Sequence, residues 1–304
     1  MKQLCSHWPR GEPREFYCLQ GDVMPPLAEI HGYQLLDRIG SGAESIIFRA
    51  KDLSTGDTVA IKYVSIDNRE NRKYLRHVCN EYKMLRLLAR RPGGLPDGVI
   101  VAYRLIRRGF LRRRKQYSLV MKYVDGVDLR RERRYPIGQL IELMRQVSDT
   151  LSALHAQGII HGDLKPENMI VSPTGRVTLV DFGFSCPSGS QLVSIRGTRD
   201  YIAPEQVDMA PLTEKTDLYN FGATMYFLFA GRHAPALMPQ PGDNAHFIGI
   251  RDWQAPPLSE VTPGIPPELD EIILRCLQKR TFERPSCIEE VREVLTAVGH
   301  KYFG

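Results

Sequence analysis

The feature that most constrains this chain is a polar stretch at 161–168, followed thirteen residues after Asn168 by Asp-Phe-Gly at 181–183. Between them lie two short apolar, β-branched runs, which are joined by Ser-Pro-Thr-Gly at 172–175. Two such runs around turn residues predict a β-hairpin. Because a hairpin brings its outer ends together, we expect Asn168 and Asp181 to lie roughly 5 Å apart across an antiparallel pair.

This end of the predicted hairpin collects the groups that phosphoryl transfer needs. Asn168 and Asp181 offer an amide oxygen and a carboxylate, which suit one hard cation. Asp163 and Lys165 lie on the loop that enters the hairpin, so an acid and a cation join them. Each of these residue types also occurs in ordinary turns, which is the alternative interpretation. The stretch and the tripeptide together, at hairpin spacing, indicate a site that moves a phosphoryl group.

The two stretches together resemble the catalytic loop and metal-binding tripeptide of the eukaryotic-like, Hanks-type serine/threonine protein kinases. The resemblance implies an α+β, two-lobed fold, in which a small, mainly antiparallel β N-lobe carries one key helix and a larger C-lobe is mainly α-helical. We expect an N-terminal extension at 1–32 and a kinase domain at 33–300. The expected N-lobe is 33–121, the hinge 122–128 and the C-lobe 129–300.

A glycine-containing loop lies between two predicted strands, 33–39 and 46–51. Glycines there let backbone N–H groups approach phosphates. No Gly-Lys-Ser/Thr follows and the next element is a strand, so this is neither a Walker loop nor a dinucleotide fingerprint. The pattern resembles the kinase glycine-rich loop, with Ser45 in place of its third glycine. The ATP-binding residues implied here are Ile39, Gly40, Ser41 and Gly42.

A lysine and a glutamate on apolar faces predict a buried ion pair. Lys62 shares one face of the predicted strand 58–64 with Ala60, and Glu81 lies on the apolar stripe of the helix predicted after Glu70. A carboxylate there is costly unless it is paired. The resemblance implies that Lys62 and Glu81 position the α- and β-phosphates, and that Ala60 contacts ATP. Glu81 at the margin of an amphipathic face is the alternative.

The stretch 119–128 resembles the strand and hinge between kinase lobes. By this resemblance Met121 lines the back of the adenine pocket, the Lys122 C=O and Val124 N–H face the adenine edge, and Asp128 reaches the ribose. A strand followed by a turn is the alternative interpretation.

The segment 181–205 resembles an activation segment that ends in Ala-Pro-Glu. The resemblance implies that Thr198 hydrogen-bonds toward Asp163 and Lys165, a feature typical of serine/threonine specificity. It also implies structural roles for three residues beyond the loop. Glu205 is expected to pair with Arg284 in a buried ion pair, and Asp217 is expected to brace the catalytic loop.

The expected reaction is transfer of the ATP γ-phosphate to Ser or Thr hydroxyls of proteins, with autophosphorylation. Asp163 would orient the hydroxyl and accept its proton, and Lys165 would offset charge on the γ-phosphate. Asn168 and Asp181 would hold Mg²⁺, or alternatively Mn²⁺. Lys62 would hold the other phosphates.

One departure from the family pattern concerns activation. Gly162 stands where the family usually has arginine, which normally pairs with an activation-loop phosphate. We therefore expect less dependence on phosphorylation of the loop serines. The sequence His-Gly-Asp also occurs in the small-molecule aminoglycoside and choline kinases, and a pseudokinase scaffold is a further alternative. The first is disfavoured by Thr198 and Arg284, the second by the presence of the predicted catalytic and metal-binding residues.

Charge and composition limit which classes of partner we expect for this chain. The net charge is +6 over 304 residues, with basic clusters at 107–115 and 130–134 that are either solvated or dock an acidic partner. No aromatic residues alternate with these charges, so nucleic acid is not expected. The first residues do not resemble a secretory signal, and no apolar run reaches the length of a membrane span. Six scattered cysteines then indicate reduced thiols and a cytoplasmic protein. Zinc at Cys5, His7, Cys18 and His31 is disfavoured by their spacing.

Overall fold

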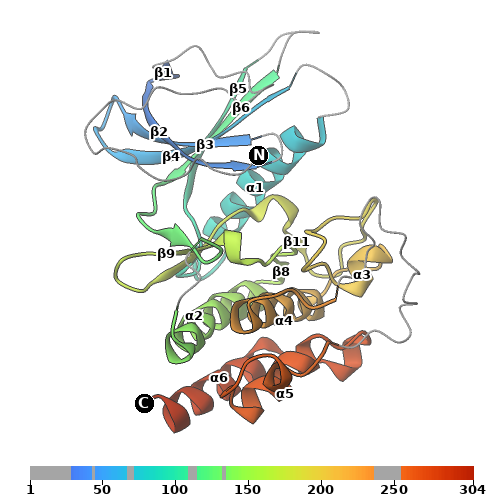
Figure 1. Cartoon of the computed structure of the whole chain (residues 1–304). Coiled ribbons are helices and arrows are strands. Elements are labelled where there is room, and N and C mark those ends of the chain that lie inside the picture. The colour runs from blue at the N-terminus through green and yellow to red at the C-terminus, as the bar shows by residue number, and fades with distance from the viewer. Residues whose placement is uncertain (1–28, 43–44, 67–71, 109–114, 132–134, 236–254) are drawn as a thin grey trace, which may run out of the picture.

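The computed structural model describes residues 29–42, 45–66, 72–108, 115–131, 135–235 and 255–304. Most of the predicted extension at 1–32, and part of each basic cluster, lie outside these residues. Within them the chain forms a β-sheet lobe above a helical lobe (Figure 1), which confirms the expected α+β fold. Within the predicted extension, Glu29–Ile30 form a short strand, β1, which pairs with β2 (Tyr33–Gly42).

The upper lobe is built on a six-stranded sheet in the order β1-β2-β3-β4-β6-β5, with every neighbouring pair antiparallel. In β3 every second residue is buried, as the period of two in a strand requires, whereas β4 is buried at six consecutive positions. The strands are β1 (Glu29–Ile30), β2 (Tyr33–Gly42), β3 (Ser45–Asp52), β4 (Thr58–Ile66), β5 (Ala102–Arg108) and β6 (Lys115–Lys122). Val99 lies before β5 and forms an isolated bridge with Leu179.

Helix α1 (Arg72–Arg90) packs against this sheet (Figure 1). Its buried residues recur at helical spacing, so one face of α1 meets the sheet and the opposite face is polar. Val78, Leu85 and Leu88 are buried on that face, and Glu81 is buried among them, in agreement with its predicted place on the apolar stripe.

The lower lobe is organised around α4 (Glu214–Ala230), of which 13 of 17 residues are buried. A helix that is apolar all round belongs in a core, and α2 (Ile137–Ala156) and α5 (Pro267–Cys276) pack against it. Helix α4 ends at Gly231, whose φ of 68° is the left-handed conformation that favours glycine. Helix α6 (Ile288–Tyr302) packs on α2 and α5 at the base (Figure 1), and α3 (Pro204–Val207) is a single turn.

The predicted hairpin is present between the lobes. β9 (Met169–Val171) and β10 (Val177–Leu179) are antiparallel, and β7 (Val127–Asp128) joins β9 on its other side. Two further short strands, β8 (Ile159–Ile160) and β11 (Cys186–Pro187), pair with each other beside it. The chain enters the hairpin through a 3-10 turn, η1 (Pro166–Asn168), and leaves it into another, η2 (Phe182–Phe184). Two further 3-10 turns among the described residues are η4 (Leu258–Glu260) and η5 (Thr281–Glu283).

None of the helices in the described ranges combines the length and apolarity needed to cross a lipid bilayer. The apolar run in α4 is instead a buried core helix.

Candidate active site

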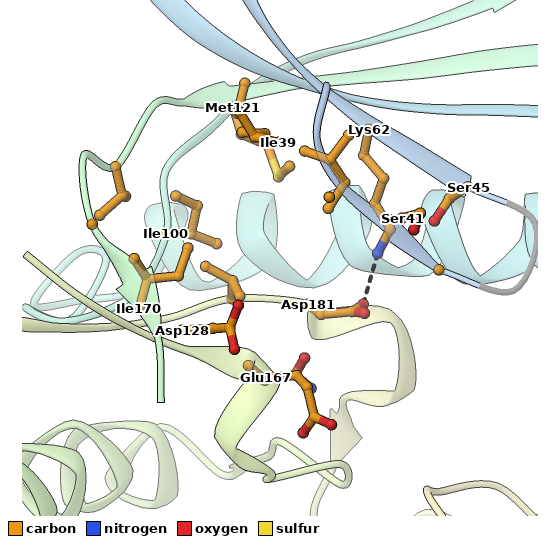
Figure 2. Close-up of a pocket in the computed structure, with 18 of the residues that line it drawn as sticks. Ile39, Ser41, Ser45, Lys62, Ile100, Met121, Asp128, Glu167, Ile170 and Asp181 are labelled. Carbon is orange, nitrogen blue, oxygen red and sulfur yellow. Dashed lines mark hydrogen bonds and ion pairs between the residues drawn. The ribbon is translucent and has the colours of Figure 1, made fainter. Parts of the chain in front are cut away.

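A cleft of about 800 Å³ lies between the two lobes (Figure 2). Its apolar part includes Ile39, Met121, Ile100 and Ile170, and its polar part includes Lys62 and Asp181. The structure brings together on its walls all of the predicted ATP-binding residues: Ile39, Gly40, Ser41, Gly42, Ala60, Lys62, Glu81, Met121, Lys122, Val124 and Asp128. The predicted metal ligands Asn168 and Asp181 line the same cleft.

The sequence did not indicate several apolar residues of the cleft wall. Ile47 comes from β3, Ile100 from the segment before β5, and Ile170 from β9. The alternation within β9 places Met169 and Val171 in the core, so Ile170 is left on the opposite face. That period of two is the signal that could have identified Ile170.

The glycine-containing segment forms the upper rim of the cleft. Gly40 and Gly42 lie in the final part of β2 and pair with Ile47 and Ser45 of β3. Ser45 stands at the third glycine of the pattern, and a Cβ added to Gly42 would lie 2.9 Å from its hydroxyl oxygen. A side chain at Gly42 would therefore require the Ser45 hydroxyl to move. Figure 2 shows Ser41 and Ser45 beside Lys62.

Lys62 is buried and lies between two carboxylates. Its Nζ donates to Glu81 Oε2 and to Asp181 Oδ1, both at 2.8 Å. Burial lowers the pKa of Lys62, but the charges of Asp181 and Glu81 outweigh this and raise it above its usual value. The structure thus shows a triad instead of the predicted pair, in which the Lys62 ammonium binds the carboxylates of both Glu81 and Asp181.

The two carboxylates of this triad respond differently to the shared lysine. Burial raises the pKa of Glu81 despite the charge of Lys62. Burial also tends to raise the pKa of Asp181, but the charge of Lys62 outweighs it and lowers that pKa to about 2. Asp181 is therefore a carboxylate at neutral pH and can serve as a cation ligand.

The hairpin register explains how Asp181 reaches Lys62. Val180 donates its N–H to Asn168 O at 2.9 Å, so Asp181 lies one residue beyond the position opposite Asn168. Asp181 has a φ of 62°, a left-handed conformation that is uncommon for a non-glycine residue. This conformation turns the chain into η2 immediately after the hairpin.

Asp163 is buried and is held by Lys165, two residues further along the chain, and by Thr198 from the segment after Asp181. The Thr198 N–H and hydroxyl both donate to Asp163 Oδ1 at 2.8 Å. Lys165 Nζ donates to Asp163 Oδ2 at 2.8 Å and to Thr198 Oγ1 at 2.7 Å. These are the contacts that the resemblance implied for Thr198. They fix one carboxylate orientation and set a cation next to it.

Asn168 lies beside the same carboxylate. Its amide nitrogen donates to the backbone oxygen of Asp163 at 2.8 Å, so its amide oxygen is the group that can coordinate a cation. In the described part of the chain, no three His, Cys, Asp or Glu side chains cluster as a metal site. One carboxylate and one amide oxygen fit a cation that takes its other ligands from phosphate and water, which is how Mg²⁺ is commonly bound.

Asp217, at the start of α4, braces the loop that carries Asp163. Its carboxylate accepts the backbone N–H groups of His161 and Gly162, both at 2.8 Å, and lies 2.9 Å from His155 Nε2. Burial tends to raise the pKa of Asp217, but the hydrogen bond from His155 and its charge outweigh burial, so the pKa is lowered overall. Gly162 has a φ of 76°, and a Cβ there would lie 3.2 Å from the Phe184 carbonyl oxygen. A side chain at this position would be strained.

Glu205 and Arg284 form the predicted pair. Arg284 Nη1 donates to Glu205 Oε1 at 2.7 Å and Nη2 donates to Oε2 at 2.9 Å. Arg284 is 2% exposed and Glu205 is 9% exposed. The pair joins the end of the segment after Asp181 to the chain between α5 and α6.

Two residues of α1 hold the segment after Asp181, and sequence reasoning missed both. Asn80 donates its amide to the carbonyl oxygens of Gly183 at 3.0 Å and Ser185 at 2.8 Å. The ring of His77 lies 4.6 Å from that of Phe184. His77 and Asn80 are three residues apart and so lie on one face of α1, which is the signal that could have suggested a common role.

Asp128 lines the cleft but also stabilises a turn. It accepts the N–H groups of Arg130 and Arg131 at 3.2 and 3.1 Å, and Arg131 Nε lies 3.1 Å from its second oxygen. Two further arginines of the basic clusters have internal contacts. Arg107 lies over the Tyr117 ring, and Arg130 pairs with Glu167.

A family model described as the protein kinase domain matches residues 33–303 of this chain. Among curated proteins, the serine/threonine-protein kinase PrkC of Bacillus subtilis is 26% identical over 85% of this chain and 39% of its own length. The serine/threonine-protein kinase PknB of Mycobacterium leprae is 29% identical over 88% of this chain and 43% of its own. A probable serine/threonine-protein kinase of Clostridium acetobutylicum is 25% identical over 89% and 40%. The chain thus spans less than half the length of these relatives.

Proposed function

Because this chain belongs to the protein kinase family, we propose that it is a serine/threonine kinase, which transfers the γ-phosphate of ATP to Ser or Thr hydroxyls of proteins and to its own. The observation that carries the proposal is the contact of Thr198 and Lys165 with the Asp163 carboxylate. It presents one buried carboxylate and one ammonium at the place where the cleft meets the segment after Asp181.

The residues take distinct roles in this proposal. Asp163 accepts a hydrogen bond from the acceptor hydroxyl and then its proton, while Lys165 offsets negative charge on the transferred group. Lys62 binds phosphate oxygens, and Glu81 holds Lys62 in place. Bound ATP supplies the phosphoryl group. Family members use ATP with a divalent metal, typically Mg²⁺, and Asn168 and Asp181 are the residues that would hold it.

The nucleotide base is assigned to the apolar part of the cleft. Met121 and Ala60 line it, and the backbone of Lys122 and Val124 passes along its edge. We also propose the predicted domain limits, with the kinase domain at 33–300 and a hinge at 122–128. Docking of an acidic partner by the basic clusters at 107–115 and 130–134 stays a prediction.

We further propose that activity does not require a phosphate on the loop after Asp181. Gly162 offers no charge for such a phosphate, and its positive φ disfavours a side chain. Asn80 and His77 instead hold the segment through two carbonyl groups and one ring. Phosphatase treatment is expected to leave transfer to an added substrate unchanged, and an inert dephosphorylated protein would contradict this.

The first experiment is intact-mass measurement of the protein before and after incubation with Mg·ATP and a generic protein rich in Ser and Thr. We expect added phosphate on one or both proteins, and none with Asp163→Ala. If no phosphate is added, a thermal-shift measurement with Mg·ATP separates the alternatives. Binding without transfer would favour a nucleotide-binding scaffold, whereas no binding would refute the active-site assignment.

A further inference from the structure

An arginine and a glutamate form a pair at the rim of the cleft, outside the proposed catalytic groups. Arg130 follows β7, and Glu167 lies in the turn η1 between Lys165 and Asn168. Arg130 Nη1 is 3.2 Å from Glu167 Oε1, and both side chains are 38% exposed. Both residues line the cleft, and Figure 2 shows Glu167 at its lower side near Asp128.

The guanidinium of Arg130 is held by more than this carboxylate. It lies 5.4 Å from the centre of the Phe227 ring in α4, and its Nη1 is 3.5 Å from the Tyr201 hydroxyl oxygen. An arginine over an aromatic face gains a cation–π attraction. Three segments distant in the sequence, at Glu167, Tyr201 and Phe227, therefore form one site for a guanidinium, and the chain fills that site with its own Arg130.

Glu167 can accept further hydrogen bonds in this site. Its second oxygen, Oε2, is buried and has no hydrogen-bond partner among the described residues. A carboxylate can accept several hydrogen bonds, and a buried oxygen left without one is costly. With Arg130 absent, Glu167 would be a negative group with neither oxygen neutralised.

The site lies close to where a protein substrate must pass. Glu167 is two residues from Lys165, so their Cα atoms are at most about 7 Å apart, and Lys165 contacts the Asp163 carboxylate. An extended substrate advances about 3.4 Å per residue. A side chain two or three residues from the acceptor hydroxyl therefore comes within reach of Glu167.

We propose that Arg130 is a specificity-determining residue, which occupies the cation site of Glu167 and thereby frees the kinase from a need for a basic residue beside the acceptor. The inference rests on the proposed function. Removing the charge of Arg130 is then expected to create a preference that the natural chain lacks. The expected gain is about tenfold in kcat/KM for a substrate that brings its own arginine, equivalent to about 1.4 kcal/mol.

The test uses peptides with a single Ser acceptor, in which one Arg or one Ala is placed in turn at each of the four positions on either side. The variant is Arg130→Met, which keeps an unbranched stem against Phe227 without the charge. We expect an Arg-to-Ala ratio of kcat/KM near one for the natural chain at every position. With Arg130→Met the ratio should rise about tenfold at one or two positions.

Three further variants of this chain test whether the effect is specific to the charges of Arg130 and Glu167. Arg130→Lys retains the charge and is expected to behave like the natural chain. Arg130→Met combined with Glu167→Gln is expected to lose the new preference, because the carboxylate is gone. Arg145→Ala is the matched control, since Arg145 is similarly exposed and pairs with Glu142 and Asp149 on α2, away from the cleft. Unfolding midpoints establish that each variant is folded.

The outcomes separate the two proposals. An unchanged ratio with Arg130→Met, or an equal rise in the Glu167→Gln combination, overturns the role of Arg130 while peptide transfer still supports the kinase. A strong Arg preference in the natural chain also overturns it. Absence of transfer to every peptide, and of autophosphorylation, by every protein overturns the proposed function and this inference with it.

Discussion

Arg284 offers the sharpest test of how the lower lobe is held together. All five of its N–H groups are used, since besides the two bonds to Glu205 it donates to the carbonyl oxygens of Lys215, Gln278 and Lys279 at 2.6, 2.8 and 3.1 Å. Arg284→Met preserves much of the volume but leaves Glu205 as an unpaired buried charge. Breaking a buried pair in this way costs about 3–5 kcal/mol.

The measurement is urea unfolding followed by circular dichroism, with the midpoint converted to a free energy by the slope. We expect Arg284→Met to lose about 3–5 kcal/mol, and the double variant Arg284→Met with Glu205→Gln to recover part of that loss because the unpaired charge is removed. Arg292→Ala is the control, since Arg292 is partly exposed and its Nη1 is 3.4 Å from Asp149. It should lose less than about 1 kcal/mol.

A loss below about 1 kcal/mol for Arg284→Met would refute this account of the pair. So would a double variant that loses the sum of the two single losses, because independent effects add whereas coupled partners do not.

Three further predictions concern the active site. Asn80→Asp keeps the side-chain shape but removes both donors to the segment after Asp181, and should lower kcat roughly tenfold and lower the unfolding midpoint, because two hydrogen bonds are lost. Asp181→Asn should abolish the thermal shift that Mg²⁺ adds to ATP, measured by titrating Mg²⁺ at fixed ATP. The lowered pKa of Asp217 means that the unfolded chain takes up a proton first on acidification. The stabilisation that ionised Asp217 contributes to the fold is therefore complete above the usual pKa of 3.8 and is lost as the pH falls through the lower pKa of the folded state. Asp217→Asn should therefore weaken the fall of the unfolding free energy with decreasing pH in the acid range.

Much of the fold could be predicted because local patterns determine it. The hairpin of β9 and β10 follows from two β-branched runs around turn residues. The burial of Glu81 follows from its place on the stripe of α1 together with Leu85 and Leu88. In both cases the side-chain period itself selects the buried face.

The predicted site residues meet in one cleft, but the sequence pattern did not reveal how their partners are shared. It indicated one partner for Lys62, whereas the structure shows two, because the left-handed Asp181 turns its carboxylate toward the β4 lysine. The pattern predicted that Asp128 contacts the ribose of ATP, whereas the structure shows that this carboxylate also accepts the N–H groups of Arg130 and Arg131.

The sequence by itself determined the element types, the order of the motifs and the set of charged groups that must find partners. Only the tertiary structure decided which partners those groups found, as with Asn80 and the carbonyls after Asp181, or Arg130 between Glu167 and Phe227. The physical reason is one of range. Periodicity is a property of neighbouring residues, whereas these contacts join segments tens of residues apart. The packing of whole elements, such as α1 on the segment at η2, sets the distance between those segments.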